Sequence, residues 1–281
     1  MTLHILRRKI VNSLMLIILS VLAFIALFCL GWLFTILIKS GYPGLRWTVL
    51  TLNTPPPGSS GGLLNAIVGS LLLSSLAVLM GAPIGILAGV FLSEYQPIGL
   101  LSTIVRFIID ILLGAPSIII GLFIYQIYVI KTGHFSGWAG CFALSIIVIP
   151  IVARTTENIY SLVPHTLRES VLALGASQWH LVRFLLIRVI KGAVFTGILL
   201  ALSRIIGEAA PLIFTALNNQ FLSFNMNQPM ANLPMTIFNF AMSPYTDWQQ
   251  LAWTGALLIT TWVFALNLLC RLLIKQFKIS N

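Results

Sequence analysis

Arg204 and Glu208 stand four residues apart in a run, residues 192–217, that contains no other charged residue. In an α-helix this spacing places both side chains on one face. A charge inside a membrane is costly, about 2.5 to 3.5 kcal/mol for a central arginine, so such residues usually line a bundle interior or a water-filled path. A guanidinium offers forked donors to an oxyanion, and the carboxylate can hold it until substrate arrives. The pair predicts a pathway for an anion; a salt bridge that only neutralises two charges is the alternative.

Arg106 and Asp110 form a second pair at the same spacing. They are expected near the cytoplasmic end of a helix, where long side chains reach water easily. We therefore leave two roles open for them, in the pathway or in the structure.

The composition places these charges in a membrane protein. Hydrophobic residues make up 58% of the 281-residue chain and charged residues 8%, and the mean hydropathy is +1.01. Soluble globular domains do not reach these values. Uncharged runs such as 11–38 and 63–92 are longer than the roughly 20 residues that cross a bilayer core. The chain is predicted to be an all-α, polytopic membrane protein.

Uncharged stretches bounded by turn residues predict six transmembrane helices. Their expected ranges are 11–38, 63–92, 111–130, 137–156, 192–217 and 250–275. The resulting segments are an N-terminus 1–10, a first helix 11–38, an external loop 39–62, a core of five helices 63–275 and a C-terminus 276–281. The core includes a cytoplasmic loop, 157–191, and a second external loop, 218–249.

The net charge of +10 is distributed unevenly between the two sides of these helices. Three basic residues fall on one side, namely Lys39, Arg46 and Lys131. Twelve fall on the other: Arg7, Arg8, Lys9, Arg106, Arg154, Arg168, Arg183, Arg188, Lys191, Arg271, Lys275 and Lys278. Since loops rich in Lys and Arg stay in the cytoplasm, both termini and the 157–191 loop are placed there. This bias accounts for most of the charge, and no nucleic-acid partner is expected.

Other sequence features argue against a metal site or enzymatic chemistry. Cys29, Cys141 and Cys270 lie in apolar runs without CxxC spacing, and His165 and His180 lack metal-ligand spacing. No HExxH, nucleophile-elbow or nucleotide-binding Walker motif occurs. We expect this chain to bind no metal or cofactor and to be no enzyme.

Small residues recur at every fourth position of the second predicted helix, at Ala77, Gly81, Gly85 and Gly89. They leave one face on which another backbone can approach closely. Packing within the chain and a subunit interface are equally compatible with this pattern. In the second external loop, Asn232 is expected to cap a short helix running to Ala241, with the loop packed on the bundle.

The cytoplasmic loop of about 35 residues is amphipathic, which is unusual for a connection. Pro164 suits the first turn of a helix whose apolar face would contain Leu167, Val171 and Leu174, with Arg168 and Glu169 off that face.

Gly175 is expected to end this helix, and Ser177 to cap a second helix that begins at Gln178. An amphipathic hairpin lying in the membrane interface, anchored by Trp179 and arginines, would explain the pattern.

Residues 169–175, Glu-Ser-Val-Leu-Ala-Leu-Gly, are similar to the EAA loop of ABC importer permeases, E-A-A-x-x-x-G. Ser170 and Val171 replace the two alanines, and the later proline of that pattern is absent near 187–188. In that family the loop forms a coupling helix that docks on the ATPase subunit. The resemblance implies that Glu169, Ala173 and Gly175 couple this chain to an ATPase.

Residues 204–212, Arg-Ile-Ile-Gly-Glu-Ala-Ala-Pro-Leu, resemble the R-x-x-G-E-x-A-P-L stretch of PstA-type phosphate permease subunits. Residues 110–117, 228–234 and 241–244 are also similar to that family, so the resemblance covers nearly the whole chain after residue 60. It implies the type I ABC importer transmembrane domain, in a bacterial inner membrane where the external loops are periplasmic.

The resemblance also implies the partners and the substrate. A PstC-type permease subunit would form a heterodimer with this chain, two PstB-type ATPase subunits would hydrolyse ATP, and a PstS-type periplasmic protein would deliver phosphate. Arg204 and Glu208 would then lie in the phosphate pathway. The chemistry of Arg204 alone serves sulfate, molybdate or phosphonate equally well, and a stand-alone anion channel or an intramembrane enzyme using Glu208 is the alternative of a different class.

Overall fold

The computed structural model describes residues 2–95 and 99–279, and among these every regular element is helical. Residue 1 and residues 280–281 of the predicted terminal segments lie outside the described residues. The long helices are α1 (Thr2–Gly41), α3 (Leu64–Val90), α4 (Leu100–Gly114), α7 (Gly137–Ser161), α10 (Lys191–Ile205) and α13 (Thr246–Ile279). The short helices are α2 (Trp47–Thr51), α5 (Ser117–Ile124), α6 (Ile130–Thr132), α8 (His165–Ala173), α9 (Gln178–Phe184), α11 (Ala210–Ile213) and α12 (Leu233–Ala241).

Four single turns complete the element order. The turn η1 (Tyr42–Gly44) is a 3-10 helix, and η2 (Phe91–Tyr95), η3 (Tyr125–Val129) and η4 (Leu185–Val189) are π-helical. Each π turn continues an α-helix, as π-bulges usually do. The proline-rich segment 55–62 forms no helix.

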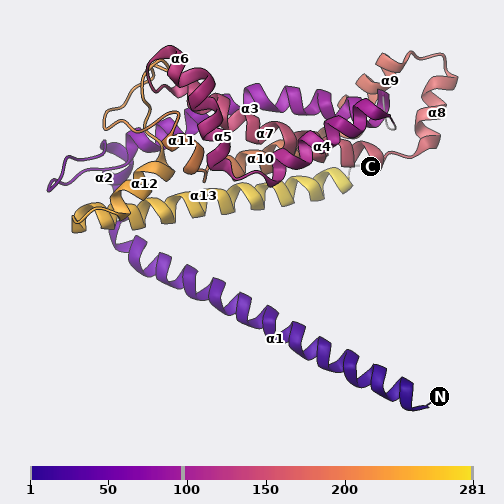
Figure 1. Cartoon of the computed structure of the whole chain (residues 1–281), viewed down its shortest axis with the longest axis horizontal. Coiled ribbons are helices and arrows are strands. Elements are labelled where there is room, and N and C mark those ends of the chain that lie inside the picture. The colour runs from indigo at the N-terminus through magenta and orange to yellow at the C-terminus, as the bar shows by residue number, and fades with distance from the viewer. Residues whose placement is uncertain (1, 96–98, 280–281) are drawn as a thin grey trace.

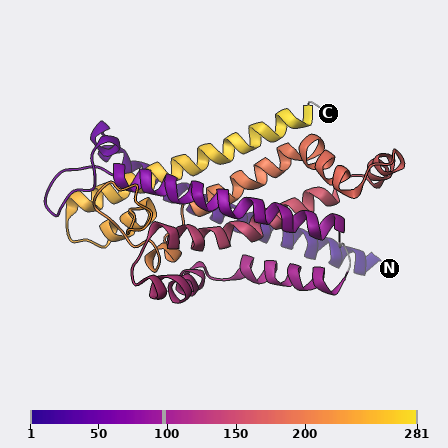
Figure 2. The ribbon, with the colours of Figure 1, turned by 90° about the horizontal axis from the view of Figure 1, so that it is seen from above.

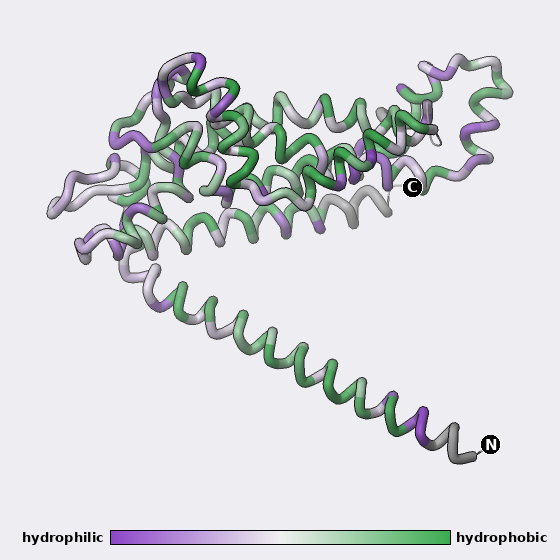
Figure 3. The backbone as a smooth tube through the Cα atoms, viewed as in Figure 1, coloured by the Kyte–Doolittle hydropathy of each residue, from purple (hydrophilic) through white to green (hydrophobic). Residues whose placement is uncertain are grey.

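The bundle is elongated, and its two ends differ in character (Figures 1 and 2). Helices α8 and α9 project beyond one end, whereas α2, α6 and α12 gather at the other. The start of α1 and the end of α13 both point towards the α8–α9 end. Figure 3 shows hydrophobic residues along the long helices and hydrophilic residues near their ends and in α8. This arrangement agrees with termini on the same side as the 157–191 loop.

Helices α3 and α7 form the centre of the bundle, and the small residues of α3 make their close packing possible. A Cβ added at Gly81, Gly85 or Gly89 would come within 3.0 Å of atoms of α7. Ser145 of α7 also donates its hydroxyl to the Ala77 carbonyl, at 3.1 Å. Of the two alternatives for this stripe, packing within the chain is therefore the one that the structure contains.

The main core lies between α3, α7 and the helices around them. Its buried members include Leu73, Leu144, Val148, Val152, Ile205 and Leu212. A second cluster at the α8–α9 end includes Tyr160, Leu181, Val182 and Leu185. A third, at the opposite end, joins Leu63 and Ala66 to Leu233 and Phe240. The bundle is thus held along its whole length, including the parts that carry the predicted site.

The second external loop folds as the sequence predicts. The Asn232 side chain caps α12 by accepting a hydrogen bond from the Met235 backbone N–H at 2.9 Å. Leu233 and Phe240 of α12 are buried in the third cluster. The expected cap and the expected packing of this loop on the bundle are both confirmed.

The count of six transmembrane helices stays a prediction. Within the described residues, four helices are long and apolar enough to cross a membrane, or five if a pair bent by 105° is one span. The four are Arg7–Gly44, Leu64–Tyr95, Gly137–Ser161 and Thr246–Leu272, and the bent pair is Leu100–Gly114 with Ser117–Thr132.

Two of the predicted helices were wrong as continuous elements, because each contains a break. The expected helix 111–130 is interrupted at Ala115, whose extended backbone (φ −69°, ψ 135°) is the conformation favoured before a proline, here Pro116. The expected helix 192–217 ends at Ile205, and the chain resumes as α11 with Pro211 in its first turn. Pro211 has no N–H to donate, so a helix continued through it would lose one backbone hydrogen bond, whereas the first turn of α11 needs no donor there.

Helix α1 is separate from the bundle for most of its length (Figure 1). All residues from Arg7 to Thr35 are exposed. Its C-terminal end is fastened to α13: Gln250 donates to the Ser40 carbonyl at 2.8 Å, and the Thr254 hydroxyl to the Gly41 carbonyl at 3.2 Å.

Candidate functional site

The two helix breaks lie against each other, and this contact builds the site. Helix α5, which follows the first break, packs on α11, which follows the second. The packing is close because Gly121 has no side chain: a Cβ there would lie 2.7 Å from Cα of Pro211. Interrupted helices meeting inside a bundle are a common way to build substrate sites in transporters.

Glu208 lies in the turn between α10 and α11 and joins both breaks. Its Oε2 accepts a hydrogen bond from the hydroxyl of Ser117, the first residue of α5, at 3.0 Å. Its Oε1 lies 3.8 Å from Nε of Arg204 on the last turn of α10. The predicted i, i+4 pair is therefore present, although Glu208 stands just beyond the helix and not within it.

The guanidinium of Arg204 keeps its donors available. A separation of 3.8 Å is an ion pair but too long for a hydrogen bond, and the described part of the chain offers Arg204 no other partner. The Arg204 side chain is 53% exposed, whereas that of Glu208 is 19% exposed. The arrangement leaves five N–H groups of a fixed cation open to an incoming oxyanion, beside a carboxylate already held by Ser117.

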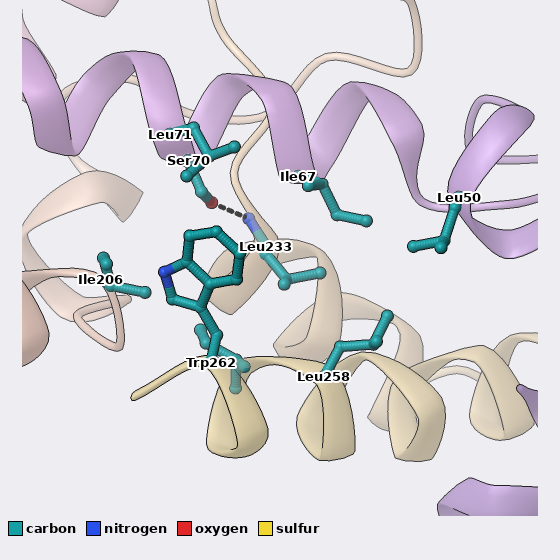
Figure 4. Close-up of a pocket in the computed structure, with 9 residues that line it drawn as sticks. Leu50, Ile67, Ser70, Leu71, Ile206, Leu233, Leu258 and Trp262 are labelled. Carbon is teal, nitrogen blue, oxygen red and sulfur yellow. Dashed lines mark hydrogen bonds between the residues drawn. The ribbon is translucent and has the colours of Figure 1, made fainter. Parts of the chain in front are cut away.

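The cavity nearest the second break has a different chemistry. Figure 4 shows it between α3, α12 and α13, with Ile206 at one side and the ring of Trp262 among its lining residues. Its volume is about 150 Å³, and the only hydrogen bond drawn in it is a short one of 2.6 Å from the Leu233 N–H to the Ser70 hydroxyl. Apart from Ser70, all of its lining residues are apolar, so this cavity does not suit an anion.

Arg106 and Asp110 belong to a network that fastens α4 to α7. Arg106 Nε lies 2.6 Å from Oε1 of Glu157, and Arg154 bridges Oε2 of Glu157 at 3.1 Å and Oδ1 of Asp110 at 3.3 Å. The positive charges of the two arginines are neutralised by the negative charges of the two carboxylates. Sequence reasoning missed Arg154 and Glu157 as partners, because they lie on a different helix.

The 157–191 loop has the predicted helix, glycine turn and helix. Gly175 follows α8 with a left-handed backbone (φ +81°), and the Ser177 hydroxyl caps α9 by accepting from the His180 N–H at 3.4 Å. Glu169, Ala173 and Gly175 are exposed on the outer surface of the loop. They are therefore available to a partner, as the EAA resemblance requires.

Two details of the α8 face were predicted wrongly. Leu167 and Val171 pack against the second core cluster as expected, but Leu174 is 88% exposed. Arg168, which was expected off the apolar face, turns inward and is 15% exposed. It pairs there with Glu94, which the sequence analysis had not singled out, since nothing local marks a partner so far away in sequence.

The comparison with known families agrees with this architecture. The family described as "Binding-protein-dependent transport system inner membrane component" matches residues 81–279. This chain belongs to that family. The match includes both helix breaks, the Arg204–Glu208 pair and the 157–191 loop.

Several relatives within this family carry a more specific name. The chain is 52% identical to the "Phosphate transport system permease protein PstA" of Haemophilus influenzae, with 96% of each chain covered. It is 48% identical to the protein of the same name in Xylella fastidiosa, over 98% of this chain and 96% of that one. The "Probable phosphate transport system permease protein PstA" of Methanocaldococcus jannaschii is 32% identical, over 90% of this chain and 89% of that one. The resemblance to PstA-type subunits is confirmed.

Solved structures of inner membrane components share the fold. An inward-facing form of the MetNI methionine ABC transporter superposes with a TM-score of 0.62 at 18% identity, covering 76% of this chain and 95% of that chain. A second form of the same transporter gives a TM-score of 0.57 at 17% identity. The fold is therefore that of an ABC importer transmembrane subunit.

Proposed function

We propose that this chain is the permease subunit of a binding-protein-dependent ABC importer that carries inorganic phosphate across the bacterial inner membrane. The observation that carries the proposal is the Arg204 guanidinium, half exposed and without a hydrogen bond to any described residue, beside a Glu208 carboxylate that Ser117 holds. The names of the relatives supply the choice of phosphate among oxyanions.

The proposed transport step uses the two interrupted helices. Phosphate displaces Glu208 from Arg204 and is held by the guanidinium fork. Because Ser117 follows one break and Glu208 lies within the other, a relative movement of the two interrupted helices changes the surroundings of Arg204. ATP-driven rearrangement would thus expose the site to each side of the membrane in turn.

The proposed partners fit the uncovered surfaces. A PstC-type permease subunit would cover the open side of Arg204 and complete the pathway. Two PstB-type ATPase subunits would dock under the α8–α9 loop, whose exposed surface carries Glu169, Ala173 and Gly175, and would use the ATP. A PstS-type protein would deliver phosphate at the α2–α12 end, with both termini cytoplasmic.

The test is phosphate uptake in vesicles that contain the complete complex and an ATP supply. Arg204→Gln removes the charge and should lower phosphate uptake about 10- to 100-fold, since a hydrogen bond to a charged group contributes about 1.5 to 3 kcal/mol. Arg204→Lys keeps the charge without the forked donors, and its phosphate uptake should lie between that of the wild type and that of Arg204→Gln. Arg46→Gln, an exposed arginine in the first external loop, is the matched control and should leave uptake unchanged.

Two outcomes would contradict the proposal. Uptake of sulfate, molybdate or phosphonate in place of phosphate, lost in Arg204→Gln, would make the chain a permease for that anion. Anion conductance by the purified chain without any ATPase subunit would make it a channel.

A further inference from the structure

A buried ion pair connects the cytoplasmic loop to the end of α3. Arg168 of α8 places Nη2 3.0 Å from Oε1 of Glu94, which lies in the π turn η2. The Glu94 side chain is 6% exposed. Charges so far from water remain stable only when they are paired, so the end of α3 and the helix α8 are held together by an interaction that is costly to break on one side.

The Arg168–Glu94 ion pair is not closed by a hydrogen bond between the two side chains. Arg168 directs its hydrogen bond from Nη2 to the Tyr160 carbonyl, at 2.6 Å. Within the described residues, Arg168 Nε and Glu94 Oε1 are buried without a hydrogen-bond partner. Buried polar atoms are nearly always hydrogen-bonded, so these two atoms are exceptions among the described residues, and the ion pair is not reinforced by a hydrogen bond between its two partners.

The same π turn is bonded to α4. The Leu92 carbonyl accepts a hydrogen bond from Nη2 of Arg106, at 3.1 Å. Arg106 is in turn paired with Glu157 of α7. The turn η2 therefore contacts one arginine from the 157–191 loop, at Glu94, and one from α4, at Leu92.

Helix α4 reaches from this turn to the candidate anion site. It begins at Leu100 and ends at Gly114, immediately before the first break, and Arg106 lies near its middle. Ser117, three residues further on, holds Glu208. An uninterrupted helix thus has the η2 contact near its middle and the Ser117 contact just past its C-terminal end.

We propose that Glu94 and Arg168 form the joint through which movement of the cytoplasmic loop reaches α4 and, by way of Ser117, the Glu208–Arg204 pair. The inference rests on the proposed function, because it assigns the joint to an ATP-driven importer. Glu94 is a positioning residue here: it acts on the site through α4 and does not touch the substrate.

The experiment measures the ratio of phosphate taken up to ATP hydrolysed by the complete complex in vesicles. Glu94→Gln breaks the ion pair but leaves Arg168 buried without a counter-charge. The double variant Glu94→Gln with Arg168→Gln removes both charges and so removes the cost of an unpaired one. Arg183→Gln is the matched control, since Arg183 is an exposed arginine of the same loop, on α9.

In the single and the double variant we expect continued ATP hydrolysis. The ratio of phosphate taken up to ATP hydrolysed should be lowered about 10-fold, which is within the range typical of coupling between two sites. Arg183→Gln should keep the wild-type ratio. A double variant that regains the wild-type ratio would overturn the proposal, because charge burial alone would then explain the single variant. A double variant that no longer binds the ATPase subunit would overturn it too, since the pair would then only anchor the loop. Absence of phosphate uptake in the wild-type complex would contradict the proposed function and not the joint.

Discussion

Ser117 donates its hydroxyl to Oε2 of Glu208 over 3.0 Å and thereby joins the start of α5 to the turn after α10. The two residues are 91 positions apart; Ser117 follows one helix break, and Glu208 lies within the other. With Oε2 engaged by Ser117, only Oε1 faces Arg204, at 3.8 Å. The hydroxyl therefore sets the direction of the carboxylate and, through it, the distance at which the guanidinium is held.

Replacing Ser117 should alter transport without altering assembly. Ser117→Ala leaves Glu208 oriented by Arg204 alone, and the carboxylate should then close on the guanidinium and compete with the anion. We expect phosphate uptake to fall about 3- to 10-fold, in line with roughly 1 kcal/mol for a side-chain hydrogen bond. Ser117→Thr keeps the hydroxyl and should retain uptake. Equal uptake in Ser117→Ala and wild type would show that the bond has no part in transport.

The crossing of α5 and α11 should not tolerate a side chain at Gly121. In Gly121→Ala the new Cβ would lie 2.7 Å from Cα of Pro211, and one of the two segments must move. Overpacking of this kind costs about 1 to 3 kcal/mol, so the melting temperature of the purified subunit should fall by several degrees. Gly31→Ala is the control: nothing lies within 4 Å of its Cβ, and alanine favours helix. Similar melting temperatures for the two variants would be evidence that the breaks separate easily.

Gly175 should be replaceable according to backbone conformation and not according to size. Its φ of +81° is left-handed, and nothing lies within 4 Å of an added Cβ. Asparagine enters this region more easily than alanine, and a β-branched residue enters it least. We expect ATPase binding and uptake to decrease in the order Gly175→Asn, Gly175→Ala, Gly175→Val. If Gly175→Asn proves the poorest of the three, contact with the partner and not backbone strain would be limiting.

Local signals predicted the parts of the fold that local forces determine. Three examples are the helix caps Asn232 and Ser177 and the helix-ending Gly175. Each of these residues acts on backbone groups only a few positions away. Each was found in the expected role. The all-α fold follows from the composition in the same way, because an apolar environment leaves the backbone few other ways to satisfy its hydrogen bonds.

The two helix breaks and the inward orientation of Arg168 could not be predicted from the sequence, because they involve contacts between distant segments of the chain. Pro116 and Pro211 were visible in the sequence, but a proline inside an apolar run is compatible with a continuous membrane helix, so the prolines alone did not predict the two breaks or the packing of α5 on α11. Arg168 turned inward because Glu94, 74 positions earlier, provides a counter-charge. Leu174 did not reach the apolar face because α8 ends at Ala173, so helical spacing no longer applies to it.

The exposure of α1 has a consequence for how the subunit is made. Because no residue from Arg7 to Thr35 is buried against the rest of the chain, the stability of this segment in the bilayer comes from its own hydropathy and from its internal backbone hydrogen bonds. It can therefore settle in lipid without waiting for the other helices of this chain to be inserted. The remaining helices are then built onto an anchor that is already in place, tethered at Gly41.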